Sequence, residues 1–239
     1  MTEKPRLGRD PKVKSVKSYI THFKLDENPI SEGGLWINGR KDGIDWIDVI
    51  TRKGVAYGEV TREGVHERRI EQGNLAVPGG NPEGNYDDPT ALLVGKWGRN
   101  QYGKARVFSR NQTEKYYQEV EIRLRSAITP HVCTGYEVFW RCLKTEKGYA
   151  EIVRWNGRVT DFTSLNKNTG LQYGVKDGDV VEATIVGNVI KGFVNGVEVI
   201  SAVDDTFKEG NPGIGFNFGV GTTNVDFGLT YLEVDSWND

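Results

Sequence analysis

Apolar and polar residues alternate strictly over residues 118–125, QEVEIRLR. Val120, Ile122 and Leu124 fall on one side, and glutamates and arginines fall on the other. A period of two predicts a β-strand with one buried face. Similar short runs, separated by turn residues, predict further strands over residues 44–51, 55–61, 136–143, 149–155, 180–186, 189–194, 197–203, 214–219 and 225–234. We find no amphipathic helix of ten residues or more.

Turn signals between these strands predict antiparallel pairing. Gly187-Asn188 and Asn195-Gly196 join residues 180–203 into a three-stranded meander, because both residue types accept a left-handed backbone. Residues 72–89, rich in Gly, Pro, Asn and Asp, predict a long surface loop. About a dozen antiparallel strands in one unit need two packed sheets, which is a sandwich or a jelly roll.

Composition agrees with this architecture. A chain of 239 residues fits one large all-β domain, and 30 Gly against one Met favours turns over helices. Six Trp, ten Tyr and nine Phe supply ample apolar area, which argues against disorder. No apolar run is long enough for a bilayer, and the polar start MTEKPRLGRD differs from a signal peptide. We expect synthesis in the cytoplasm, followed by association with a virion, or secretion if a leader was removed.

Positive charge gathers at the start of a chain whose net charge is -2. Residues 1–24 hold seven Lys/Arg against Glu3 and Asp10, a balance of +5. We therefore predict a basic arm over residues 1–21 and one domain over residues 22–239. The simplest interpretation of the arm is a solvated tail. The alternative is a strap through residues 1–24 for self-assembly or for an acidic capsid or tail neighbour, whereas nucleic acid would need more clustered charge.

The two cysteines, Cys133 and Cys142, lie nine residues apart. A disulfide between neighbouring strands is one interpretation. We favour two reduced, buried thiols, because the chain shows no leader for export. No Cys-x-x-Cys pair occurs, and the three histidines are isolated in the sequence.

Two stretches carry a family resemblance. Residues 22–39 (HFKLDENPISEGGLWING) place an aromatic-led strand before an Asn-Pro turn and a Gly-Gly-x-Trp strand start. Residues 177–215 place the Gly-Asn and Asn-Gly meander before Asp-Asp-Thr and Gly-x-Pro-Gly-Ile-Gly. This order, over roughly residues 22–234, resembles the concanavalin A-like, laminin-G-like jelly-roll domains of bacterial secreted and phage structural proteins. The resemblance implies a jelly-roll sandwich of two antiparallel sheets that binds glycans or proteins, decorates virions or cuts polysaccharides.

Catalysis is the less favoured class. Jelly-roll glucanases carry Glu-x-Asp-x-x-Glu on one strand, whereas this chain has Glu119, then Glu121 in place of Asp, then Leu124 in place of the closing Glu. Arg123 on the same face would keep a neighbouring carboxylate ionised, so we interpret these residues as an exposed ion-pair ladder.

A polysaccharide lyase or hydrolase acting on an acidic polysaccharide is the alternative function. Its candidate catalytic residues are Arg123, Arg141, Tyr117, Glu119, Glu121 and His131. The Gln-x-His strand of such lyases is missing, and His131 falls in a predicted loop.

Non-catalytic recognition is the favoured class, as a lectin-like carbohydrate-binding module or a virion structural protein. Trp97, Asn100 and Tyr102 lie among Gly, Asn and Gln, a composition typical of an exposed loop, and form the first candidate sugar patch. Trp155 and Asn156 at a strand end form the second. For each aromatic residue, core packing is the competing interpretation.

Metal binding is the weakest prediction. Asn85, Asp87 and Asp88 in the long loop offer hard oxygen ligands of the kind that calcium prefers. No EF-hand spacing accompanies them, and such residues commonly start turns. We therefore expect no cofactor, with calcium as the open alternative.

Overall fold

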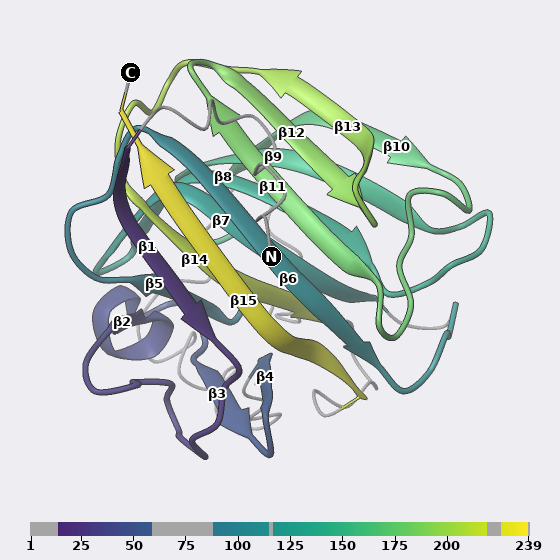
Figure 1. Cartoon of the computed structure of the whole chain (residues 1–239), viewed down its shortest axis with the longest axis horizontal. Helices are drawn as coiled ribbons and strands as arrows, with labels where there is room; N and C mark the ends of the chain where they lie inside the picture. Colours follow the sequence, from purple (N-terminus) through teal and green to yellow (C-terminus); the bar gives the residue numbers. More distant parts are fainter. Residues whose placement is uncertain (1–13, 59–87, 115–116, 219–225, 239) are drawn as a thin grey trace.

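The structure, a computed structural model, describes residues 14–58, 88–114, 117–218 and 226–238 (Figure 1). Two antiparallel sheets pack face to face and confirm the predicted all-β sandwich. The first sheet has the order β13-β12-β11-β6-β15-β4-β3, with β1 also paired to β15, and the second has the order β10-β9-β8-β7-β14-β5-β2. Within the described ranges no helix has the length and apolar composition that crossing a bilayer requires.

The strands of the first sheet are β1 (Ser15–Thr21), β3 (Val49–Arg52), β4 (Val55–Gly58), β6 (Asn100–Ser109), β11 (Val180–Val186), β12 (Val189–Val194), β13 (Val197–Val203) and β15 (Phe227–Trp237). Those of the second are β2 (Trp36–Asn38), β5 (Thr90–Leu93), β7 (Gln118–Thr129), β8 (Val132–Arg141), β9 (Tyr149–Gly157), β10 (Phe162–Thr169) and β14 (Asn211–Phe218). A single π-helical turn, η1 (Gly39–Gly43), follows β2.

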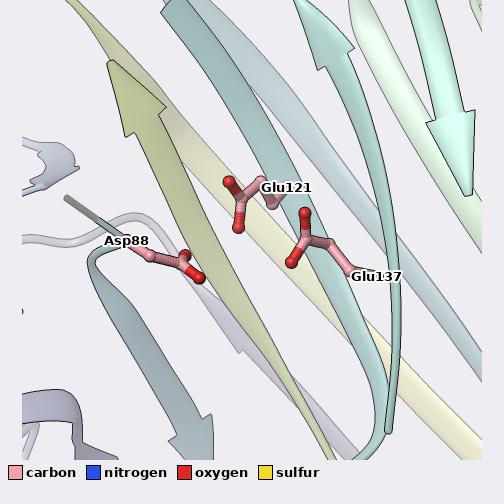
Figure 2. A group of neighbouring side chains, drawn as sticks. All are labelled: Asp88, Glu121 and Glu137. Atoms are coloured by element: carbon pink, nitrogen blue, oxygen red, sulfur yellow. The ribbon is translucent and has the colours of Figure 1, made fainter. Parts of the chain in front are cut away.

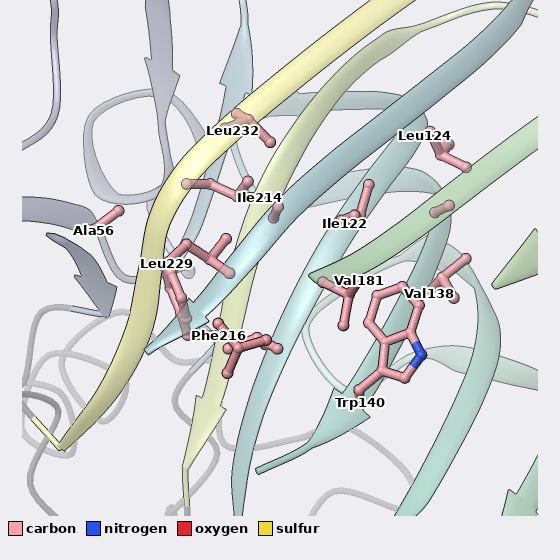
Figure 3. Close-up of a cluster of buried hydrophobic side chains, with 14 of the residues drawn as sticks. Ala56, Ile122, Leu124, Val138, Trp140, Val181, Ile214, Phe216, Leu229 and Leu232 are labelled. Carbon is pink, nitrogen blue, oxygen red and sulfur yellow. The ribbon is translucent and has the colours of Figure 1, made fainter. Parts of the chain in front are cut away.

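The core lies between the two sheets (Figure 3). Val120, Ile122 and Leu124 of β7 are fully buried there, as their alternation predicts. Trp140 of β8 is also completely buried, and Figure 3 shows its indole near Val181 of β11. The apolar face of the sequence pattern is therefore the inner face of the second sheet.

The predicted meander is confirmed. Strands β11, β12 and β13 pair antiparallel, with Val186 opposite Val189 and Val194 opposite Val197. Asn195 has a φ of 52° and Gly196 a φ of 80°, the left-handed conformation that this turn requires. Both cysteines are free and buried, as expected.

The predicted arm needs correction at its end. Residues 15–21 form β1, which pairs antiparallel with β15 along Figure 1's outer edge, and Tyr19 packs edge-on against Trp36 at 5.8 Å. These residues therefore belong to the sandwich, because their backbone hydrogen bonds complete a sheet. Residues 1–13 lie outside the described residues, so the strap through residues 1–24 stays a prediction.

Several strands were missed because their sequences are too polar to show a clear alternation. The clearest cases are β6 and β10, with sequences NQYGKARVFS and FTSLNKNT. Conversely, the strand expected over residues 44–51 begins at Val49, since residues 44–46 form a bend and Ile47 makes only an isolated bridge to Pro89. The part of the predicted long loop before Asp88 lies outside the described residues.

Candidate functional site

Three buried carboxylates converge on the outer face of the second sheet. Figure 2 shows Asp88, Glu121 of β7 and Glu137 of β8 pointing toward one another, and one oxygen of each lies within 4.8 Å of the others. Arg123 Nη2 lies 2.7 Å from Asp88 Oδ1, 3.2 Å from Glu121 Oε2 and 3.0 Å from Glu137 Oε2. We call Asp88, Glu121, Arg123 and Glu137 the acidic cluster.

Local sequence explains this arrangement. The period of two places Glu119, Glu121 and Arg123 on the face of β7 opposite the core, and Arg123 pairs across the strands with Glu137. Gly215 of β14 lies opposite Glu121, and a Cβ at Gly215 would overlap Glu121 Oε2. Glycine is therefore needed here, because the two charged side chains lie across β14.

Burial controls the ionisation of the cluster. Burial raises the pKa of Glu121 well above its usual range, and the negative charges of Glu137 and Asp88 raise it further. Burial also raises the pKa of Glu137 to about 7, although Arg123 favours its ionised form. The exposed ion-pair ladder predicted for this face is wrong: Glu119, Glu121 and Arg123 are 4%, 1% and 0% exposed.

Within the described residues, one group of His, Cys, Asp or Glu side chains is close enough together to hold a metal ion: Asp88, Glu121 and Glu137. The Arg123 guanidinium already lies within salt-bridge distance of an oxygen from all three. It therefore supplies the counter-charge that a cation would otherwise bring. Of the predicted calcium ligands, Asp88 belongs to this cluster, whereas Asn85 and Asp87 lie outside the described residues.

Glu119 lies beside the cluster but has different partners. Tyr149 Oη donates to Glu119 Oε1, and Asn217 Nδ2 donates to Glu119 Oε2 at 2.7 Å. Burial raises the pKa of Glu119 to about 6, although both hydrogen bonds favour its ionised form. A cavity of about 20 Å³ is lined by Asp88, Glu119, Glu121, Glu137, Phe139, Val153, Trp155, Phe162 and Asn217. That volume holds about one water molecule and is far too small for a sugar ring.

Of the other candidate catalytic residues, Arg141 borders Glu119: it lies opposite Glu119 on β8, and its guanidinium is 5.6 Å from the centroid of the Tyr149 ring. Arg141 donates to the backbone carbonyls of Lys147 and Glu114, and its guanidinium lies 5.7 Å from the ring of exposed Tyr117. His131 lies in the turn between β7 and β8, with Nδ1 2.9 Å from Asp45 Oδ2.

Arg125 also departs from the pattern. The alternation places it beside Arg123, but a register shift after Leu124 and a φ of 46° at Arg125 redirect the side chain. Its guanidinium donates to the backbone carbonyls of Arg99, Phe207 and Gly187. The prediction of a continuous charged row on β7 is therefore wrong at its last position.

The exposed aromatic patches expected from the sequence are buried. Trp97, Asn100 and Tyr102 are 8%, 1% and 3% exposed, because Asn100 begins β6 and is not part of a loop. Tyr102 Oη donates to Glu182 Oε1 at 2.7 Å. Trp155 is 2% exposed and donates to Glu137 Oε2 at 2.7 Å, so of the second pair only Asn156 reaches the surface.

A large hollow opens where β6 and β14 begin and β15 ends. Its volume is about 790 Å³, and it is lined by Gly95, Lys96, Trp97, Arg99, Glu209, Gly210, Asn211 and Asn238. We call it the Trp97 hollow. The sequence pointed to Trp97, but the residues from 209–211 and 238 lie more than a hundred positions away. Only the strand pairing brings them together.

Hydrogen bonds fix the walls of the Trp97 hollow. Trp97 Nε1 donates to the Val94 carbonyl at 3.3 Å, and Lys17 Nζ lies 4.6 Å from the ring centroid. Asn238 Oδ1 accepts from the Arg99 amide at 3.0 Å. Asn211 Nδ2 donates to the Gly95 carbonyl at 3.3 Å. The hollow thus combines an aromatic edge, two amide side chains and exposed charged groups on an ordered backbone.

Comparisons with known proteins identify the fold. No family model and no curated protein sequence matches the chain. Among solved structures, an inactivated mutant of β-agarase B in complex with agaro-octaose aligns with a TM-score of 0.59 at 11% identity, covering 98% of each chain.

Two further structures align over most of their length. A prokaryotic β-1,3-1,4-glucanase (lichenase) from a mouse hindgut metagenome aligns with a TM-score of 0.51 at 12% identity, covering 92% of this chain and 99% of that one. Carbohydrate-binding module CBM66 from Bacillus subtilis aligns with a TM-score of 0.51 at 10% identity, covering 88% and 98%.

These structural alignments establish the architecture. At such low sequence identity they leave the activity open, since both hydrolases and a binding module align. The chain has the concanavalin A-like lectin/glucanase jelly-roll fold, which carbohydrate-binding modules and glycoside hydrolases share.

Proposed function

We propose that the protein is a carbohydrate-binding module without glycoside-hydrolysing activity, and that it binds glycans in the Trp97 hollow. The observation that carries this proposal is the composition of the hollow. An apolar aromatic edge next to a few fixed polar groups in a concave site is typical of small-ligand recognition. Trp97 is 8% exposed, so the exposed edge of its ring is what can contact the C–H groups of a sugar, while Asn211 and Asn238 line the same hollow for its hydroxyl groups.

The arrangement on β7 argues against hydrolysis. Retaining glycosidases need two carboxyl groups about 5 Å apart across an open bond, one of them a proton donor. Here Arg123 binds Glu121, while Tyr149 and Asn217 bind Glu119. The cavity between them admits about one water molecule. Each carboxylate therefore has a partner within the protein, and a glycosidic bond has no room to approach.

A blocking substitution tests the binding proposal. Asn238 is exposed and lines the hollow, so Asn238→Trp should fill part of it and remove the hydrogen bond to the Arg99 amide, without changing the core. The matched control is Gln172→Trp, also an exposed amide, located near the loop between β8 and β9. On a glycan array, at least one glycan should bind the wild type and the control and be lost from Asn238→Trp. Equal binding by all three proteins, or none by any, would refute the proposal.

A separate assay tests the absence of hydrolysis and of the alternative lyase activity. Incubation with agarose, mixed-linkage β-glucan or alginate should release no reducing ends and no unsaturated uronate. Release that is lost in Glu119→Gln would restore the enzyme interpretation. The assembly role expected for residues 1–24 rests on sequence alone, and no contact within the described residues favours it over glycan binding.

A further inference from the structure

We infer that the Trp97 hollow selects glycans that carry an acidic group, a carboxylate or a sulfate, through Lys96 and Arg99. This inference rests on the proposed function and adds the class of ligand. It begins from an imbalance of charge: among the described residues that line the hollow, Lys96 and Arg99 are cations and Glu209 is the one carboxylate. The chain as a whole has a net charge of -2, so this local excess of cations departs from the average surface.

Lys96 supplies an unneutralised cation. It is exposed, and no carboxylate of the described residues lies within salt-bridge distance of its ammonium group. Lys17 adds a second ammonium 4.6 Å from the centroid of Trp97, where it donates to the Val94 carbonyl at 2.6 Å. Lys96 lines the hollow itself, and Lys17 adds positive charge on the Trp97 ring beside it.

Arg99 has a partner that a ligand can replace. Its Nη2 lies 3.3 Å from Glu209 Oε1, with 64% of the Arg99 side chain and 74% of the Glu209 side chain exposed. Such an exposed ion pair contributes little to stability. The acidic group of a ligand can therefore take the place of the Glu209 carboxylate at Arg99 with little loss of free energy. The guanidinium can bind a carboxylate or sulfate through two parallel hydrogen bonds. Asn238 holds the backbone of Arg99 and so fixes where its side chain begins.

The test compares charged and neutral ligands on the same variants. Calorimetry should use oligosaccharides of alginate for carboxylate, of carrageenan for sulfate and of agarose as the neutral galactan. We expect at least one acidic ligand to bind about tenfold more tightly than the neutral one at low salt, with affinity falling as salt rises. The double variant Lys96→Gln/Arg99→Gln should lose that advantage, and Glu209→Gln should increase it.

Lys147 and Glu114 provide the matched control. They form an exposed ion pair beyond the far end of β6, which spans roughly 33 Å. Glu114→Gln changes the net charge by the same amount as Glu209→Gln, and Lys147→Gln removes one of the two positive charges that the double variant removes. Both control variants should leave both affinities unchanged. Thermal unfolding confirms that each variant is folded.

The outcomes separate this inference from the proposed function. If the neutral ligand binds as tightly as both acidic ligands, and Asn238→Trp no longer binds it, the charge preference is overturned and the glycan site is kept. If Lys147→Gln and the double variant lower the affinity for the acidic ligand equally, the charge preference is also overturned, because the attraction is then non-specific. Absence of all binding would overturn both proposals.

Discussion

Replacing Arg123 by methionine removes the cation that three buried carboxylates share. At an effective dielectric of about 20, each oxygen at 2.7–3.2 Å from Nη2 attracts it by about 5–6 kcal/mol. When both are ionised, two carboxylate oxygens within 4.8 Å of each other repel by about 3 kcal/mol or more. Removing one partner of a buried ion pair costs about 3–5 kcal/mol. We therefore expect Arg123→Met to lose about 4 kcal/mol of the free energy of unfolding at about pH 8, a large share of the usual 5–15 kcal/mol.

Urea unfolding at two pH values tests this reasoning. In the variant the carboxylates can be neutralised by protons, so the loss at about pH 5 should be less than half of the loss at about pH 8. Arg154→Met is the control, because Arg154 is one-quarter exposed and binds a single carboxylate, Asp204, at 2.6 Å. It should lose about 1 kcal/mol. An equal loss for Arg123→Met at both pH values would refute the charge argument and indicate lost packing instead.

Three further predictions concern the same molecule. Burial raises the folded-state pKa of Glu119 to about 6 and of Glu137 to about 7 from 4.5. The stability that these two groups contribute is therefore fully present below about pH 4.5 and should be lost as the pH rises through about 7, with about 2 kcal/mol lost for Glu119 alone. Stability that rises between about pH 5 and about pH 8 in urea titrations would contradict this. Gly215→Ala should lower stability by about 1–3 kcal/mol by displacing Glu121, and an unchanged melting temperature would contradict that packing. Burial raises the pKa of Cys133 to about 12, so a thiol reagent should modify it only upon unfolding, and modification of the native protein would disprove its burial.

Local sequence was sufficient for the elements whose signal lies within a few residues. The meander followed from two turn dipeptides, and the buried face of β7 followed from its alternation. By contrast, β10 and β1 were missed because their strand residues are largely polar. For β1 the partner also lies far along the chain, since Ser15 pairs with Trp237.

The candidate sites were harder to predict for the same reason. Alternation showed which face Glu121 occupies, but it could not show that Asp88 and Glu137 would gather around Arg123. The result is a buried network in place of an exposed ladder. Trp97 lines the hollow, although the exposure expected from the sequence was wrong. Residues 209–211 and Asn238, which complete the hollow, lie more than a hundred positions away, so no local pattern could predict the whole site.

A crystal structure of the full chain with a bound acidic oligosaccharide tests the central claim most directly. We predict a sugar ring against the edge of Trp97, with its acidic group within hydrogen-bond distance of Arg99 or Lys96. A sugar bound instead across β7 and β8, with a glycosidic oxygen beside Glu119 or Glu121, would contradict a non-catalytic glycan site in the Trp97 hollow.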